Sequence, residues 1–190
     1  MLTPEEIERA VRREELVGAK AKAKEALAAL VSARVRDGVW HTTNTARFQG
    51  IVTSGAILPE PLIADGDRWS TSQGKEWYPY VRTLGGVSLF DFSGFEPEEY
   101  SKAFPVSSWW EFVPYRSVWN EAVWIEIDAD ALGPGFISGR ALLERWNAGR
   151  VGNRIMPQIE SAHLGPIPLS SFKSVFVVRE GLAALLPINW

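Results

Sequence analysis

The sequence predicts an α+β domain that carries an N-terminal helical arm. Residues 1–37 are rich in Ala, Glu, Lys and Arg, as expected of a helix, whereas residues 38–190 contain short β-branched and aromatic runs separated by turn residues. The irregular spacing of these runs argues against a doubly wound sheet. We therefore expect an arm over residues 1–37 and one α+β domain with a mixed β-sheet core over residues 38–190.

The composition excludes several kinds of site. The 190 residues include no cysteine and only two histidines, so disulfides, thiolate metal sites and cysteine nucleophiles are excluded and we expect no metal. The net charge of −3 does not favour nucleic acid, although a local basic groove remains compatible with it. No apolar run approaches the ~20 residues of a membrane span, and the acidic start MLTPEEIERA is unlike a signal peptide. We expect a cytoplasmic protein that does not enter a membrane.

The arm reads as one long amphipathic helix over residues 3–36. Thr3 and Glu6 form a capping-box pattern, and Pro4 suits the first helical position. Gly18 is a site at which the helix could divide in two. A narrow apolar stripe suits docking on the body of the protein, on a partner or on a second copy of the chain. Interspersed charges do not favour a nucleic-acid-binding arm.

The body alternates between strands and helices. Turn signals and apolar spacing predict the following order: a strand over 38–43, a helix opened by Asn44 or Thr45 that stops at Gly55, a loop over 59–77, a strand over 87–92, a helix over 96–104, a strand over 122–132, a helix over 140–149, and two strands within 153–180 around Gly165.

Two ionisable residues stand out. His41 follows Trp40 in the first strand, where it is either a strand-end histidine held by a hydrogen bond or a residue that grips a ligand. The run around Glu160 reads as a strand, and period-2 alternation then places Gln158 and Glu160 on one face. His163, beside Gly165, is interpreted as structural.

The order of these motifs carries a resemblance. A histidine–threonine strand is followed by a helix ending in SGAI, a serine-bearing strand VSLFDF and a late strand with Q-x-E. This order resembles the ADP-ribosyltransferase fold, in particular compact, toxin-like microbial and phage members whose first motif is H-x-T. The resemblance covers roughly residues 38–179. The chain has neither the first-motif arginine nor the E-x-E of other members, and its middle motif departs from the usual tyrosine pair.

The resemblance implies NAD⁺ as cosubstrate and assigns a role to each motif. His41, with Thr42 and Thr43, would hold the nicotinamide-side ribose and the phosphates. Ser88 would shape the nicotinamide pocket. Glu160 would bind the ribose 2′-hydroxyl and stabilise a cationic sugar, a role for which a fixed carboxylate is chemically suited.

Further roles in the resemblance concern the acceptor, the nicotinamide ring and the diphosphate. Gln158, two residues before the glutamate, would help to select the acceptor. Tyr80, or Tyr78 in its place, would stack on the nicotinamide ring. The diphosphate calls for cations, for which the candidates are Arg82, Arg68 and Arg154.

The resemblance implies transfer of ADP-ribose from NAD⁺ to a macromolecule, either protein or nucleic acid. Hydrolysis of NAD⁺ is the same chemistry with water as acceptor. A non-enzymatic interaction or inhibitor protein is the alternative, with nine tryptophans available for a binding surface, and carbohydrate binding is a third candidate. On the enzymatic interpretation, His41 and Glu160 should flank one cleft and face one ribose, and side chains that open onto opposite faces of the sheet would contradict it.

Overall fold

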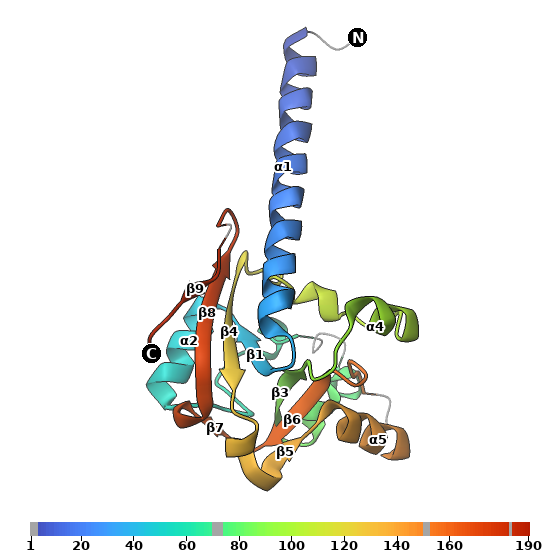
Figure 1. Ribbon diagram of the computed structural model, residues 1–190, viewed down its shortest axis with the longest axis vertical. Coiled ribbons are helices and arrows are strands. Elements are labelled where there is room, and N and C mark those ends of the chain that lie inside the picture. Colours follow the sequence, from blue (N-terminus) through green and yellow to red (C-terminus); the bar gives the residue numbers. More distant parts are fainter. Residues whose placement is uncertain (1–3, 70–73, 150–152, 183) are drawn as a thin grey trace.

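A long helix projects from an α+β body in the computed structural model, which describes residues 4–69, 74–149, 153–182 and 184–190 (Figure 1). Helix α1 (Pro4–Val35) is continuous, and Gly18 does not interrupt it. A single glycine costs a helix only about 1 kcal/mol, which its neighbours, mostly good helix formers, can offset. The predicted cap at Thr3 lies outside the described residues.

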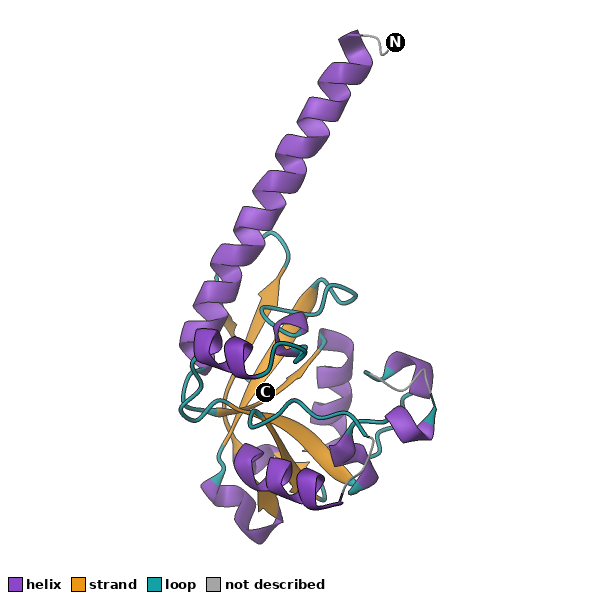
Figure 2. Ribbon diagram, turned by 90° about the vertical axis from the view of Figure 1, so that its right-hand side faces the viewer, coloured by secondary structure: helices purple, strands orange, loops and turns teal. Residues whose placement is uncertain are grey.

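The last third of α1 buries apolar side chains against the body, and above it Lys24 and Lys20 make polar contacts with Ser117 and Glu180. Leu27, Val31 and Val35 recur every four residues, so they share one side of the helix, and they are at most 3% exposed. Higher up, Leu16 and Val17 are 64% and 61% exposed. The upper part of the helix therefore stands clear of the body, as both views show (Figures 1 and 2).

One large antiparallel sheet forms the body. Its strands stand in the order β5-β6-β3-β1-β4-β8-β9, and a separate pair is formed by β2 and β7. The bounds are β1 (Val39–Thr43), β2 (Ala56–Ile57), β3 (Gly86–Asp91), β4 (Glu121–Ile127), β5 (Phe136–Ile137), β6 (Glu160–Leu164), β7 (Ile167–Pro168), β8 (Phe172–Arg179) and β9 (Leu186–Pro187). We expected a mixed sheet, but each of these strand pairs is antiparallel.

The shorter helices are α2 (Thr45–Ser54), α3 (Tyr80–Thr83), α4 (Pro97–Ala103) and α5 (Gly139–Gly149). Three of the four, α2, α4 and α5, agree with the predicted helices, whereas α3 was not predicted. The Asn44 side chain accepts a hydrogen bond from the amide of Arg47 and so caps α2, which ends at Gly55 with φ of 76°. Gly55 ends the helix as predicted, and of the two candidates for its start, Asn44 is the one that provides the cap.

The two faces of the sheet bury different side chains. Cross-strand partners point to the same side of a sheet, and neighbours along a strand point to opposite sides. One face, here called the aromatic face, carries Trp40, Phe90, Trp124 and Phe176, which are in ring contact. The opposite, aliphatic face carries Val39, Leu89, Ile125 and Val175. The end of α1 covers the aromatic face, and α2 covers the aliphatic face.

Segment 107–119, rich in aromatics, mainly contributes to the core. Phe112, Val113 and Tyr115 are buried with the aromatic face, whereas Trp110 is 62% exposed.

Candidate functional site

Glu160 is the most unusual ionisable residue of the described body. It is the first residue of β6 and has no exposed surface. The Ser88 hydroxyl donates to its Oε1 and the Met156 amide donates to its Oε2, both at 2.9 Å. Each carboxylate oxygen thus has a neutral donor.

Burial determines the titration of this carboxyl. Removal from water raises the pKa of Glu160 to about 7, while the hydrogen bonds from Met156 and Ser88 act in the opposite direction. Neither of these donors carries a charge that could offset the loss of solvation. Glu160 is therefore poised to exchange a proton near neutral pH, a property common in functional sites.

A tight turn leads into Glu160. The amide of Glu160 donates to the carbonyl of Met156 at 2.9 Å, while the carboxylate of Glu160 accepts from the amide of Met156. Asp91, on β3, holds the same turn by donating its amide to the Ile159 carbonyl at 2.8 Å. A Cβ added to Gly139, at the start of α5, would overlap the Gln158 carbonyl oxygen. The turn is thus fixed from several sides.

This turn corrects the predicted position of Gln158. We expected Gln158 and Glu160 on one face of a strand, but β6 begins only at Glu160. Gln158 has φ of 64°, in the left-handed region, and its side chain is exposed while Glu160 is buried. Pro157 has no N–H for a strand ladder, and its carbonyl instead accepts from Ile159 at 2.7 Å, closing a tight turn.

His41 lies where β1 and β3 separate. Their paired residues are Val39 with Asp91 and Trp40 with Phe90, and the ladder stops there. The His41 ring is partly buried, and its Nδ1 lies 3.1 Å from the Ser88 carbonyl oxygen. Burial lowers the pKa of His41 and the contact with Ser88 raises it, with burial the larger effect. A neutral ring that donates from Nδ1 fits this geometry.

His41 and Glu160 are connected through Ser88 but do not flank one cleft. Trp40 pairs with Phe90, and Phe90 pairs with Glu160, so Glu160 belongs to the aromatic face. His41 is the neighbour of Trp40 along β1, so its side chain leaves the sheet on the aliphatic side. The predicted arrangement around one ribose is therefore not the one observed.

The two threonines after His41 divide between the faces. Thr42 pairs with Trp124 and shares the side of Glu160, and its hydroxyl oxygen is buried without a hydrogen-bond partner. Thr43 pairs with Val123 on the aliphatic side and is 4% exposed. Of the two, only Thr42 has its hydroxyl on the side of Glu160.

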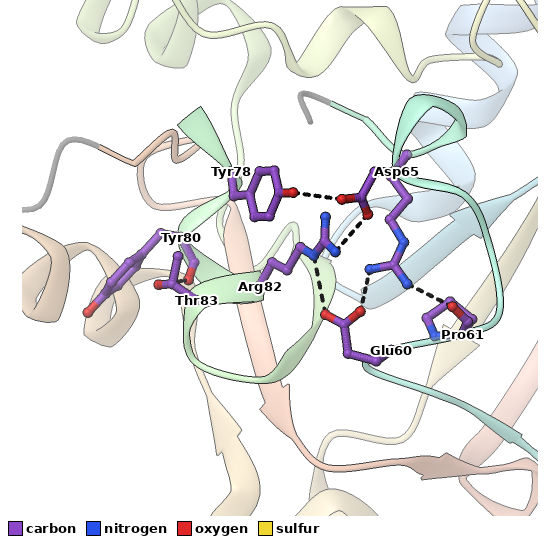
Figure 3. Close-up of polar contacts among 8 residues, drawn as sticks. Glu60, Pro61, Asp65, Tyr78, Tyr80, Arg82 and Thr83 are labelled. Atoms are coloured by element: carbon purple, nitrogen blue, oxygen red, sulfur yellow. Dashed lines mark hydrogen bonds and ion pairs between the residues drawn. The ribbon is translucent and has the colours of Figure 1, made fainter. Parts of the chain in front are cut away.

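Tyr80 and Arg82 have protein partners of their own. Tyr80 is 8% exposed and packs in a small cluster that includes Leu142 of α5. The Arg82 guanidinium donates to Glu60 at 3.2 Å and to Asp65 at 2.8 Å (Figure 3). Neither side chain is presented to a ligand in this state.

The remaining candidates are also engaged. Arg68 contacts Glu60 at 2.7 Å. The guanidinium of Arg154 lies 5.8 Å from the centre of the Trp77 ring. Nδ1 of His163 lies 3.0 Å from the Gly165 carbonyl, in keeping with the structural role expected for it.

Sequence reasoning missed three contributors. The Met156 amide carries no signal in the sequence, because any residue but proline supplies one. Glu60 and Asp65, which neutralise the two arginines, lie in a loop whose path cannot be read from its turn residues. The available signal for these ion pairs was that the loop contains acidic residues as well as Arg68, a candidate phosphate ligand.

The described residues include neither a metal-binding cluster nor a membrane-spanning helix. No group of three or more histidine, aspartate or glutamate side chains in this part of the chain is placed to hold a metal ion. No helix among the same residues combines the length and apolar character that crossing a bilayer requires.

Comparison with known proteins assigns the chain to no family: no family model matches it, and no curated protein matches its sequence.

Proposed function

We propose that this protein transfers ADP-ribose from NAD⁺ to a macromolecular acceptor, with Glu160 as the carboxylate that stabilises the cationic sugar. One observation carries the proposal. The three motifs selected from the sequence are up to 119 residues apart, yet His41 contacts the Ser88 carbonyl and the Ser88 hydroxyl contacts Glu160. All three residues lie on adjacent strands of the sheet, and Ser88 and Glu160 share its aromatic face, whereas His41 points to the aliphatic face.

The chemistry suits a lone carboxylate. The bond between nicotinamide and the ribose C1′ breaks, and neutral nicotinamide leaves with the bonding electron pair. Positive charge then develops on the sugar, where a fixed anion lowers the barrier. The acceptor nucleophile forms the new bond to C1′ and releases a proton. With a pKa of about 7, Glu160 is partly ionised at neutral pH, and a cationic sugar favours its charged form.

The proposal requires the turn before Glu160 to move. Glu160 has no exposed surface, and the Met156 amide occupies one of its oxygens. Release of that amide frees Oε2 for the ribose 2′-hydroxyl, while Ser88 continues to hold Oε1. Thr42 is the first-motif residue on the same side of the sheet, and its hydroxyl lacks a partner. This revises the ligand-binding role that the resemblance gave to His41.

Release of nicotinamide from NAD⁺ is the direct test. The wild type and Glu160→Gln are incubated with NAD⁺, with and without cell lysate as a source of acceptors. Glu126→Gln is a matched control, because Glu126 also lies in the sheet and accepts a serine hydroxyl, that of Ser174. We expect Glu160→Gln to lose activity by about 100-fold or more and the control to keep it. Absence of nicotinamide in every wild-type reaction would overturn the proposal.

The acceptor is identified in the same assay. With NAD⁺ labelled on the adenosine side, label that survives nuclease but not protease assigns protein, and the reverse assigns nucleic acid. Nicotinamide release without labelled macromolecule assigns hydrolysis. A protein that releases no nicotinamide but captures a partner through exposed tryptophans such as Trp110 would instead fit the interaction-protein alternative.

A further inference from the structure

Three cations gather around the surface loop that precedes β4, and each packs against an aromatic ring of that loop. Nζ of Lys24, on α1, lies 5.2 Å from the centre of the Tyr115 ring. The guanidinium of Arg116 lies 5.1 Å from the centre of the Trp119 ring, and that of Arg47, on α2, lies 5.5 Å from the same centre. Lys24, Arg47 and Arg116, here called the basic patch, thus alternate with aromatic rings.

The basic patch is not neutralised by carboxylates. None of its three cations takes part in an ion pair found within the described residues. Nζ of Lys24 donates to the Ser117 hydroxyl at 3.1 Å, and Nη2 of Arg47 donates to the Asp67 carbonyl oxygen. Both acceptors are uncharged groups, so the patch keeps its positive charge.

This arrangement is costly for the two guanidiniums. Burial lowers the pKa of Arg116, and to a lesser degree Glu111 raises it and Arg47 lowers it. Burial also lowers the pKa of Arg47, with the charge of Asp67 acting in the opposite direction. Two partly desolvated like charges that share one indole ring are relieved by an anion from outside the protein.

The ring contacts orient the guanidiniums without using their N–H groups. A cation–π contact engages the charge and the flat face of the group, whereas its N–H donors project from the edge. Arg116 makes no hydrogen bond within the described part of the chain, and Arg47 donates only from Nη2. Oriented guanidiniums with unused donors suit phosphate oxygens, which they bind in pairs.

A single-stranded nucleic acid fits this surface better than an acidic peptide or a duplex. Its phosphates repeat along the chain and can meet successive cations, while its bases stack on aromatic rings and guanidinium planes. An acidic peptide supplies the charge without the bases, and a duplex keeps its bases stacked inside. Trp119 is only partly buried and its neighbour Val118 is 76% exposed, so a strand can reach this surface.

We propose that the basic patch binds a single-stranded nucleic acid. Arg47 and Arg116 bind its phosphates, Trp119 holds both guanidiniums in position, and Lys24 extends the contact toward α1. Binding of the strand requires neither NAD⁺ nor Glu160, so this proposal stands or falls separately from the transfer of ADP-ribose.

The position of the basic patch gives the strand a role in the proposed reaction. The Arg116 guanidinium lies 5.6 Å from the centre of the Phe112 ring, and Phe112 is in ring contact with Phe90, the strand partner of Glu160. A strand on the patch is therefore held beside the aromatic face that contains Glu160. The inference that this strand is the acceptor, and this inference alone, rests on the proposed function.

Binding is measured by fluorescence anisotropy with a labelled oligonucleotide of mixed sequence, without NAD⁺ and at several salt concentrations. Arg47→Ala combined with Arg116→Ala should weaken binding about tenfold or more. Loss of two phosphate contacts should also make the slope of log affinity against log salt shallower by about 1.4. Arg140→Ala combined with Arg145→Ala is the matched control, because it removes the same charge from two exposed residues of α5 and should leave the slope unchanged.

Variants of the ring test whether it positions the cations. Trp119→Ala should weaken binding although it leaves every charge in place, and Trp119→Phe should restore part of the loss because it keeps an aromatic ring. Circular dichroism checks that each variant is folded, and Arg47→Gln with Arg116→Gln gives the same comparison should the alanine pair unfold.

The proposal is overturned by unchanged affinity in the Arg47 and Arg116 double variant, or by an equal loss in the control, which would indicate net charge alone. Equally tight binding of a duplex or of a polyglutamate peptide also overturns it. Tighter binding of a deoxyribo- or a ribo-oligonucleotide of the same sequence supports it and assigns the strand as DNA or RNA. Nicotinamide release without strand binding would overturn this proposal and leave the proposed function standing.

Discussion

Glu160 and Glu60 show how differently one side chain behaves in two parts of this protein. Glu160 is fully buried between neutral donors, and its pKa is raised to about 7. Burial would also raise the pKa of Glu60, but its hydrogen bonds to Arg68 and Arg82 outweigh this and lower it. The number of polar contacts does not decide the charge state, because both carboxylates have two partners. The decisive difference is whether those partners bring a positive charge.

The pH dependence of stability should separate the two carboxylates most clearly. The unfolded pKa of Glu160 is near 4.5 and the folded pKa about 7, so its contribution is full below 4.5 and is lost as pH rises through 7. We expect the wild type to lose about 3 kcal/mol of folding free energy relative to Glu160→Gln between pH 4.5 and 8.5. Urea unfolding of both proteins at several pH values measures this. Parallel curves would contradict the raised pKa.

Gly139→Ala should displace the turn that precedes Glu160 and so change both the stability of the protein and the pKa of Glu160. The added Cβ would overlap the Gln158 carbonyl, so the turn must shift, at a cost of about 2–3 kcal/mol. Water admitted to Glu160 should also lower its pKa toward 4.5. Gly18→Ala is the control, because a Cβ there meets nothing within 4 Å. Thermal unfolding and the NMR titration of Glu160 measure both effects, and equal behaviour of the two variants would contradict the account of the turn.

Ser88→Ala should have a smaller effect. The Ser88 hydroxyl favours the charged form of Glu160, so its loss raises the pKa of Glu160 further and costs about 1 kcal/mol at pH 8.5. The cost should shrink at pH 5, where Glu160 is protonated. Ser174→Ala removes a similar serine–glutamate bond, to Glu126, and serves as control. A pH-independent cost in Ser88→Ala would mean that the hydroxyl serves only packing.

Glu60→Gln should change stability least. The Glu60 side chain is 57% exposed, so solvent screens its attraction to the arginines and the loss should stay below about 1 kcal/mol. Since the pKa of Glu60 is lowered, its contribution is present above pH 4.5 and disappears as pH falls below that value. Unfolding in 0.1 M and 1 M salt tests this, because only a screened interaction vanishes at the higher concentration. A loss of folding free energy that is well above 1 kcal/mol and persists in 1 M salt would contradict a solvent-screened role for Glu60.

Local patterns predicted the elements well where local physics decides them. Asn44 and Gly55 bound α2 because the cap and the left-handed stop depend only on neighbouring residues. The period-2 alternation of a strand places Ile125 of β4 with the aliphatic side chains and Trp124 with the aromatic ones.

Predictions failed where distant segments decide. Gln158 reads as a strand residue, but the turn that it occupies is held by Gly139 and Asp91 from other elements. The face on which His41 emerges follows from its register against β3, which no local pattern encodes. Arg82 looked available for a phosphate because its partners, Glu60 and Asp65, are 22 and 17 residues away.

The β1–β3 ladder ends early, which leaves a weak connection within the sheet. The ladder joins β1 to β3 through two residue pairs, whereas five pairs join β1 to β4. Five residue pairs also join β3 to β6 and seven join β4 to β8, so the β1–β3 ladder is the shortest connection among these central strands. His41 on β1 and Ser88 on β3 lie just beyond the end of this ladder, where the ring of His41 contacts the Ser88 carbonyl oxygen. This contact adds to the two residue pairs that hold β1 and β3 together, so a movement that separates these strands would have to break it.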